Sequence, residues 1–286
     1  MSPQTNSDAL EFAQALGLAR LDAQLLLLHV LRRPSHDRAW LLTHDDDPLP
    51  IERAAAFRQL AQRWAAGEPL AYLVGHKEFF GLDLTVDTRV LVPRPDTETL
   101  VDWALDQLQA EGAVAHPHVL DLGTGSGAIA LAVAHTLQSR GRPARVVAVD
   151  ASSQALAAAK ANATRLALDV SFLNSDWFDQ VAGCFDLIVS NPPYIADTDP
   201  HLAQLTHEPL EALTSGADGL NDLRRIIGQA PAHLQAGGWL LLEHGYDQSE
   251  AVRSLLAQHG FVDVQSRLDL SGIERCSGGR WTGTAG

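Results

Sequence analysis

The chain has 286 residues, 46% of them hydrophobic, which suffices for one large domain and one small domain, each with an apolar core. The formal net charge is −14, and an acidic surface repels a phosphate backbone, so direct nucleic-acid binding is not expected. There is no secretion leader, no apolar run near the ~18 residues of a membrane span, and only two isolated cysteines, which predicts a cytoplasmic protein without a membrane partner or a metal site.

Residues 8–75 are predicted to be helical. Apolar residues recur there at three- and four-residue steps, and Pro34 and Gly67 each end a helical segment. The expected helices cover Leu10–Leu18, Asp22–Leu31, His36–Thr43 and Ile51–Ala66. Because no strand pattern and no catalytic constellation occurs in this part, we interpret residues 1–76 as a small helical domain.

Residues 77–92 have a different pattern. Between Phe79 and Val86, apolar and polar residues alternate around Gly81, which is typical of a short β-hairpin. We interpret this segment as a connector between two domains.

Strand and helix patterns alternate through residues 93–286. The expected strands are His118–Asp121, Arg145–Asp150, Val170–Leu173, Phe185–Ser190, Trp239–Glu243 and Phe261–Ser266. The expected helices are Asp96–Ala110, Ala128–Gln138, Ser153–Leu166, Leu220–Leu234 and Gln248–His259. Such alternation predicts an α/β domain with a parallel sheet covered on both faces, whose ligands bind beyond the carboxyl ends of the strands.

The first strand of this domain runs into a glycine turn that opens a helix. The turn contains Asp121, Gly123, Thr124, Gly125, Ser126 and Gly127. Glycines let the backbone turn tightly and approach a ligand, and a helix start presents free N–H groups. The turn therefore indicates a nucleotide-type cofactor, and Gly123, Gly125 and Ala128 fit a dinucleotide fingerprint as well.

Acidic residues near the ends of the first three strands refine this cofactor site. Asp150 can accept hydrogen bonds from both hydroxyls of a ribose, a feature that nicotinamide enzymes share. Asp121 suits a ligand with a cationic amino-acid end, whose ammonium it would hold directly or through water. Asp176 can bind an adenine amino group. Trp177 either packs on the adenine ring or belongs to the core.

The most informative motif follows the strand Phe185–Ser190 and consists of Asn191, Pro192, Pro193 and Tyr194. Two prolines remove two N–H donors and stiffen the backbone. The side-chain carbonyl of Asn191 and the backbone carbonyl of Pro192 can accept the two hydrogens of an –NH2 group, while Tyr194 packs on its flat face. A mere turn is the alternative interpretation.

A planar amide or amino nitrogen is a weak nucleophile that no side chain readily deprotonates. What accelerates its methylation is orientation for in-line attack, which can contribute roughly 7–11 kcal/mol. Two carbonyl acceptors also stabilise the positive charge that develops on the nitrogen. The residues alone therefore predict methyl transfer to a planar nitrogen.

With these motifs in place, the sequence resembles the HemK/PrmC family of release factor glutamine-N5 methyltransferases over nearly its whole length. The matching stretches are Gly67–Tyr72 with Gly75, Phe79–Gly81, Leu91–Glu98, Asp121–Gly127, Asp150, Asn191–Tyr194, Glu208-Pro209, Gly219-Leu220, Gly237-Gly238, Leu242–Gly245 and Asp269–Arg275. Family members often carry Ile and Glu where Val92 and Asp96 stand, and both changes keep the chemical type.

The resemblance implies a seven-stranded, Rossmann-like class I methyltransferase domain at residues 93–286. It implies that S-adenosylmethionine is the methyl donor, that S-adenosylhomocysteine is the product, and that Gly123–Gly127, Asp150, Trp177 and Asn191 contact the cofactor. The implied acceptor is the glutamine of the Gly-Gly-Gln motif in peptide chain release factors. The helical domain would dock on the release factor, and we expect the enzyme to be a monomer.

Three further residues are expected near the glutamine. Arg94, Pro95 and Glu98 belong to a Pro-Arg-Pro-Asp-Thr-Glu stretch that suits a helix start, and we expect it to form a wall of the glutamine pocket as well. Glu208-Pro209 is interpreted as a candidate lid.

Three other functions fit parts of the sequence less well. An adenine-N6 nucleic-acid methyltransferase would use the same tetrad, but it needs a basic groove that the charge of −14 disfavours. A cofactor-binding regulatory protein would leave the intact tetrad without a role. A nicotinamide-dependent enzyme lacks any hydride-transfer site here and would leave Asn191–Tyr194 unexplained.

Overall fold

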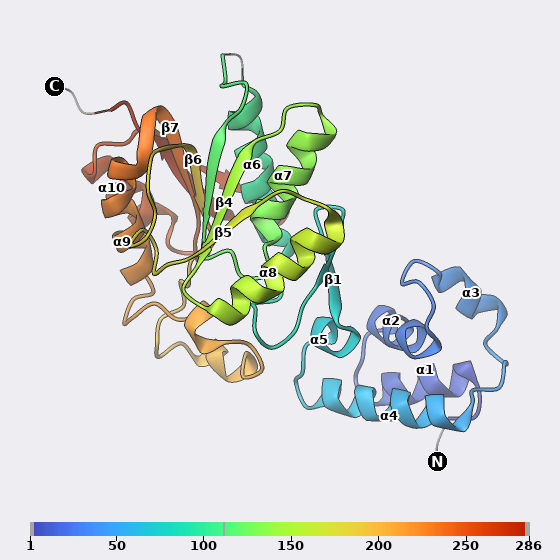
Figure 1. Ribbon diagram of the computed structural model, residues 1–286. Coiled ribbons are helices and arrows are strands. Elements are labelled where there is room, and N and C mark those ends of the chain that lie inside the picture. Colours follow the sequence, from blue (N-terminus) through green and yellow to red (C-terminus); the bar gives the residue numbers. More distant parts are fainter. Residues whose placement is uncertain (1–2, 111, 284–286) are drawn as a thin grey trace. The chain divides into compact units, whose positions relative to one another are not determined.

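The computed structural model describes residues 3–110 and 112–283. The chain divides into two compact units, one of Met1–His76 with Ala203–His207 and the other of Lys77–Leu202 with Glu208–Gly286. Figure 1 shows the elements of both. No helix among the described residues is long and apolar enough to cross a membrane.

The first unit is built from helices, as the periodicity predicts. They are α1 (Asn6–Ala15), α2 (Arg20–Leu31), α3 (Arg38–Thr43), α4 (Ile51–Ala65) and α5 (Leu70–Val74). Thr5 and Asp8 form a capping box at the start of α1, which satisfies backbone N–H groups that the helix leaves unpaired. The core of the unit is apolar and includes Leu27 and Phe57, both without exposed surface.

A two-stranded hairpin follows, formed by β1 (His76–Phe79) and β2 (Leu82–Thr85). Its turn has Phe80 and Gly81 at positive φ, and glycine takes the second position without steric cost. The fully buried Asn162 bonds the hairpin end to the glycine turn, because its side chain pairs with the Thr85 backbone and donates to the Ser126 carbonyl. The hairpin is therefore joined to the turn of the candidate cofactor site.

The second unit contains a seven-stranded sheet with strand order β5-β4-β3-β6-β7-β9-β8. Its strands are β3 (His118–Leu122), β4 (Arg145–Asp150), β5 (Ser171–Asn174), β6 (Phe185–Ser190), β7 (Leu234–Glu243), β8 (Val262–Leu268) and β9 (Glu274–Arg280). The first five are parallel, and β9 runs antiparallel to both of its neighbours. The predicted α/β class I methyltransferase fold is confirmed.

Successive residues of each buried strand face opposite sides of the sheet, so the strands feed two cores. One core packs against α6 (Glu98–Gln109), α7 (Ala128–Ser139) and α8 (Ser153–Leu166). The other packs against α9 (Asn221–Gln229) and α10 (Ser249–Gln258). In β3, Val119 belongs to the first core and Leu120 to the second. Figure 1 shows the two helical layers on either side of the sheet.

Several elements differ from the sequence prediction, among them α5, which was not predicted, and β7, which begins at Leu234 rather than at Trp239. The helix expected over Leu220–Leu234 stops at Gln229 and continues as a 3-10 turn, Ala230–His233, because Pro231 cannot donate within a helix. The strand β9 was not among the strands predicted from the pattern. Its Gly278 packs so closely on the sheet that a Cβ there would lie 2.5 Å from Leu241. A strand that contains such small residues does not show the alternation of apolar and polar residues by which strands are predicted.

Candidate functional site

Polar residues that follow parallel strands meet in one cavity of about 250 Å³ at the carboxyl ends of β3, β4, β5 and β6. Its walls come from the glycine turn, the strand ends and the segments 89–91 and 209–212. The lining residues are Arg89, Val90, Leu91, Gly123, Gly125, Asp150, Ala151, Ser152, Ala155, Ser175, Asp176, Trp177, Asn191, Pro193, Pro209, Glu211, Ala212 and Asp222. Seven of the predicted site residues are therefore brought together.

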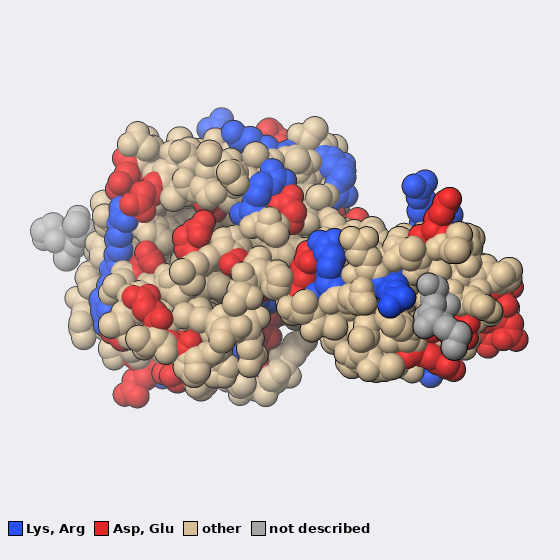
Figure 2. Space-filling view, turned by 90° about the horizontal axis from the view of Figure 1, so that it is seen from below, with Lys and Arg blue, Asp and Glu red and all other residues tan. Residues whose placement is uncertain are grey.

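The charged residues of the lining are mainly acidic. Asp150, Asp176, Glu211 and Asp222 contribute carboxylates, whereas Arg89 is the only basic residue among the described lining. Figure 2 views the molecule from below and shows Asp and Glu side chains scattered over the visible face, with Lys and Arg side chains between them. Such a cavity favours a ligand that carries positive charge.

The glycine turn holds Asp150 in place. Gly123 and Gly125 have positive φ, and the Gly125 N–H donates to Asp150 Oδ2 at 2.9 Å. The Ser152 N–H donates to the other oxygen at 2.8 Å. Burial raises the pKa of Asp150 against the effect of these two N–H donors. Each carboxylate oxygen keeps accepting capacity, so two hydroxyls of a ribose can still be bound.

Asp121 lies behind the turn rather than in the cavity wall. Its Oδ2 accepts from the Thr124 hydroxyl at 2.6 Å and from the Ala130 N–H at 3.2 Å. Its Oδ1 is buried and has no hydrogen-bond partner among the described residues. Burial raises the pKa of Asp121 to about 7. Thr124, Ser126 and Gly127 belong to the same turn, and they do not line the cavity either.

Trp177 also lines the cavity. Its ring lies against the glycine turn, since a Cβ on Gly123 would be 3.3 Å from Trp177 Cζ3. Its Nε1–H donates to Asp222 Oδ1 at 3.0 Å, and Asp222 is itself held by the Ser215 hydroxyl at 2.7 Å. The ring also packs against the apolar core on the α9 side, so Trp177 combines both sequence interpretations.

Asp176 lines the cavity but also forms a surface ion pair. Its Oδ2 lies 2.7 Å from Arg225 Nη1, and its side chain is 56% exposed. A hydrogen bond from an adenine amino group to Asp176, as predicted from the sequence, would therefore compete with the ion pair between Asp176 and Arg225.

The tetrad Asn191–Tyr194 follows β6 directly. Asn191 Nδ2 donates to Thr97 Oγ1 at 3.2 Å, and no donor among the described residues is found for Asn191 Oδ1. The Tyr194 hydroxyl donates to Glu243 Oε1 at 3.4 Å, and Gln248 donates to the Tyr194 carbonyl at 3.0 Å. Burial raises the pKa of Tyr194, so its phenol stays protonated. The tetrad thus presents an amide oxygen beside a fixed aromatic ring.

The Pro-Arg-Pro stretch lies outside the cavity lining. Arg94 pairs with the buried carboxylate of Glu208, which also accepts from the Val92 N–H at 3.1 Å. Glu98 accepts from the Phe80 N–H at 3.0 Å and so supports the hairpin turn. Pro95 opens the 3-10 turn Pro95–Thr97 that leads into α6.

Sequence reasoning missed five residues that the structure places at the site. Asp222 and Glu211 line the cavity, whereas Thr97, Glu243 and Glu208 lie behind the tetrad or the loops. Glu208-Pro209 was interpreted as a candidate lid without a role for the carboxylate, and Leu242–Gly245 was noticed only as a matching stretch. Nothing in the residues around Asp222 distinguishes it from an ordinary first-turn helix acid.

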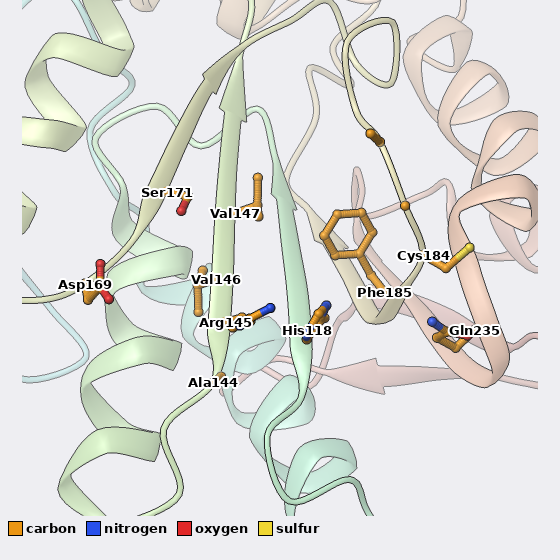
Figure 3. A pocket seen from close by; sticks show the side chains of 12 residues that line it. His118, Ala144, Arg145, Val146, Val147, Asp169, Ser171, Cys184, Phe185 and Gln235 are labelled. Carbon is orange, nitrogen blue, oxygen red and sulfur yellow. The ribbon is translucent and has the colours of Figure 1, made fainter.

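A larger hollow of about 610 Å³ lies at the amino ends of the strands. Figure 3 shows its labelled lining, with His118 and Arg145 at the starts of β3 and β4 and Cys184 before β6. No group of His, Cys, Asp and Glu residues able to hold a metal ion is found in the described part of the chain. Because the tetrad and the glycine turn lie at the opposite strand ends, the smaller cavity is the candidate site.

Comparison with known proteins shows the family of the chain. Residues 99–218 match the Methyltransferase small domain family, and residues 7–75 match the PrmC N-terminal domain family. A "Release factor glutamine methyltransferase" from Bordetella pertussis is 54% identical over 92% of this chain and 95% of its own length. Another from Burkholderia pseudomallei is 48% identical over 99% of this chain and 98% of its own.

Solved structures show the fold alone. A methyltransferase from Pyrococcus furiosus superposes with a TM-score of 0.50 at 20% identity, covering 72% of this chain and 91% of that chain. A class I S-adenosylmethionine-dependent methyltransferase from Listeria monocytogenes reaches 0.51 at 12% identity, covering 98% of this chain and 86% of that one.

Proposed function

This chain belongs to the release factor glutamine methyltransferase family, and we propose that its Asn191–Tyr194 tetrad holds the glutamine that is methylated. The reaction moves a methyl group from S-adenosylmethionine to the N5 amide nitrogen of the glutamine in the Gly-Gly-Gln motif of a release factor, leaving S-adenosylhomocysteine. The observation that carries the assignment of the tetrad is the free side-chain oxygen of Asn191 at the cavity.

The cavity fits the cofactor in three respects. Its acidic lining suits a ligand with an ammonium and a sulfonium, and Asp150 keeps accepting capacity for a ribose. Gly123 lets the Trp177 ring pack directly against the turn, where a side chain would press on it, so that both line the cavity. Asp121 lies behind the turn, and its Oδ1 has no hydrogen-bond partner among the described residues. This oxygen can accept a hydrogen bond from the ammonium, either directly or through water. When bound, S-adenosylmethionine supplies an electrophilic methyl group.

The residues of this chain contribute orientation and electrostatics. Asn191 Oδ1 and the Pro192 carbonyl accept the two hydrogens of the glutamine –NH2 group, which aims the nitrogen lone pair at the cofactor. The same acceptors stabilise the charge that grows on that nitrogen. The protonated Tyr194 packs on the amide plane. The proton leaves to solvent after transfer, so no side-chain base is needed.

The helical unit is proposed to dock on the release factor. Three large apolar side chains on it are unusually exposed: Ile51 at 81%, Leu42 at 62% and Leu21 at 47%. If these side chains form one contiguous patch, that patch would suit a protein partner. We also propose that the enzyme acts as a monomer in the cytoplasm, where its substrate works in translation.

One experiment tests the proposed function directly. Labelled S-adenosylmethionine is incubated with the enzyme and an intact release factor, the same factor with its motif Gln replaced by Ala, or DNA. Label should enter only the intact factor, and Asn191→Ala should abolish transfer while keeping most of the cofactor affinity. Full activity of Asn191→Ala would contradict the role of the tetrad, and labelled DNA would favour the adenine-N6 alternative.

A further inference from the structure

Trp177 has a strained backbone conformation at the cavity. Its φ is +48°, in the left-handed region that bulky residues rarely adopt. The Ser175 hydroxyl donates to the Trp177 carbonyl at 3.0 Å, and the ring packs on the turn at Gly123. Such strain persists only where the surrounding contacts over-determine the conformation, and it is concentrated at active sites and ligand clamps. The contacts of the Trp177 ring therefore indicate what this conformation serves.

The polar edge of the Trp177 ring is bound by Asp222. An indole Nε1–H can only donate, and it lies 3.0 Å from Asp222 Oδ1. Asp222 belongs to the first turn of α9, whereas Trp177 follows β5. Both residues line the cavity, so this hydrogen bond joins two distant segments of the chain in its wall.

A buried serine fixes the carboxyl group of Asp222. Ser215 is 3% exposed, and its hydroxyl donates to Asp222 Oδ2 at 2.7 Å. The same hydroxyl oxygen accepts from the Asp222 backbone N–H at 2.8 Å. The Ser215 N–H in turn donates at 2.9 Å to the carbonyl of Ile195, the residue after the tetrad. Oδ2 is thereby held by Ser215, while Oδ1 is directed at Trp177.

We infer that Asp222 is a positioning residue that fixes the Trp177 ring as a wall of the cofactor site. Ser215 orients the carboxyl group, and the carboxyl group orients the ring through its Nε1–H. This inference rests on the proposed binding of S-adenosylmethionine in the cavity. Asp222 acts on the cofactor through Trp177 rather than by direct contact.

A purely structural role at the start of α9 accounts for only part of these contacts. An acid in the first turn suits the positive end of a helix, and the reciprocal hydrogen bonds with Ser215 serve as a cap. Those contacts use Oδ2 and the backbone N–H of Asp222. They leave unexplained why Oδ1 meets an indole that lines the cavity with a strained backbone.

The test is a double-mutant cycle on the Kd for S-adenosylmethionine, measured by calorimetry. Asp222→Leu removes both acceptor oxygens at similar size and should raise the Kd about tenfold. In Trp177→Phe, which lacks the N–H but keeps an aromatic ring, the further change Asp222→Leu should alter the Kd little. A tenfold effect of Asp222→Leu in both backgrounds would overturn the inference, because Asp222 would then act without the indole N–H.

The conservative variant Asp222→Asn separates positioning from helix stability. Its amide oxygen can accept from the Trp177 Nε1–H while its –NH2 group donates to Ser215 Oγ, so the Kd should stay within about twofold of the wild type. A Kd raised as far as in Asp222→Leu would contradict the inference. This comparison remains decisive if Asp222→Leu does not fold, since an equally large rise in Kd above the wild type in Asp222→Asn overturns the role.

Asp218→Ala is the matched control for an acid at the start of α9. Asp218 is exposed, pairs with Arg224 and does not line the cavity, so the Kd of this variant should equal that of the wild type. A Kd raised as far as in Asp222→Leu would show that α9, rather than the bond to Trp177, determines affinity, and would overturn the inference.

Failure of the cofactor site itself is recognised with Trp177→Ala. Weaker binding of S-adenosylmethionine in Trp177→Ala, together with a wild-type Kd in Asp222→Leu, would overturn only the positioning role of Asp222. An unchanged Kd in Trp177→Ala would contradict the proposed cofactor site and the inference together.

Discussion

Asp150 is the residue whose environment most clearly indicates a ligand-binding role. Two backbone N–H groups hold its carboxylate at the cavity, and burial would otherwise favour its neutral form. Hydrogen bonds to a charged group contribute about 1.5–3 kcal/mol each. We therefore expect Asp150→Ala to weaken S-adenosylmethionine binding by roughly one to two orders of magnitude in calorimetry.

Asp179→Ala serves as the matched control, because Asp179 is an exposed acid near the site that pairs with Arg225 and does not line the cavity. Its affinity for the cofactor should equal that of the wild type. Unchanged affinity in Asp150→Ala would remove Asp150 from the ribose site.

The raised pKa of Asp121 predicts that cofactor binding is coupled to the loss of a proton. Its pKa is raised by burial from 3.8 to about 7, so the folded enzyme without cofactor favours the protonated carboxyl and loses stability as the pH rises through that window. A bound ammonium near Oδ1 would reverse this preference and expel the proton. Calorimetry at pH 7 in buffers of different ionisation enthalpy should therefore detect proton release.

Asp121→Asn should reduce that release while the cofactor's own amine titrates as before in both proteins. Identical proton release in wild type and variant would show that Asp121 does not sense the ammonium.

At the scale of elements, the loops around the cavity are joined by one buried carboxylate. Glu208 accepts from the Val92 N–H and pairs with Arg94, and it is followed by Pro209, Glu211 and Ala212 in the cavity wall. The two walls formed by segments 89–91 and 209–212 therefore depend on it. Glu208→Ala should raise the Kd for S-adenosylmethionine severalfold, and Glu208→Gln, which still accepts from Val92, should raise it less.

Asp199→Ala is the control, since Asp199 is an acid of the same loop whose partner is the exposed His201. If Glu208→Ala bound the cofactor like Asp199→Ala, the two loops would hold their positions without the ion pair.

The strand β9 and the end of α9 escaped sequence prediction for different physical reasons. Hydrophobic periodicity detects segments whose side chains fill a core, and β9 contributes small residues that let Leu241 and Trp103 approach its backbone. The end of α9 is set by a local rule, the missing N–H of Pro231, which the broader apolar pattern outweighed in the prediction. Long, strongly periodic elements such as α7 and β6 were predicted within one residue.

At the scale of the whole molecule, we expect the helical unit to dock on the release factor and the methyltransferase unit to bind the cofactor and the glutamine. Each has its own apolar core. A chain that begins at residue 77 should keep its affinity for S-adenosylmethionine, yet show a much higher KM for an intact release factor. Its KM for a short Gly-Gly-Gln peptide should change little, because the peptide reaches only the tetrad.

Cofactor binding by the shortened chain is the control for folding. Equal increases of KM for the intact factor and for the peptide would argue against a docking role of the helical unit.

The sequence by itself determined the chemistry and the fold class. The glycine turn, Asp150 and the tetrad are local patterns, in which neighbouring residues specify backbone shape and donor supply without help from the rest of the chain. The alternation of strands and helices likewise predicts that these motifs meet at the carboxyl ends of the sheet.

Only the tertiary structure decided how the motifs are supported. Thr97, Glu208, Asp222 and Glu243 act on partners far away in the sequence, and a polar residue carries no local sign of the partner it will meet. The fold alone buries these side chains and brings them to their hydrogen-bond partners. Burial also raises the pKa of Glu243 to about 7.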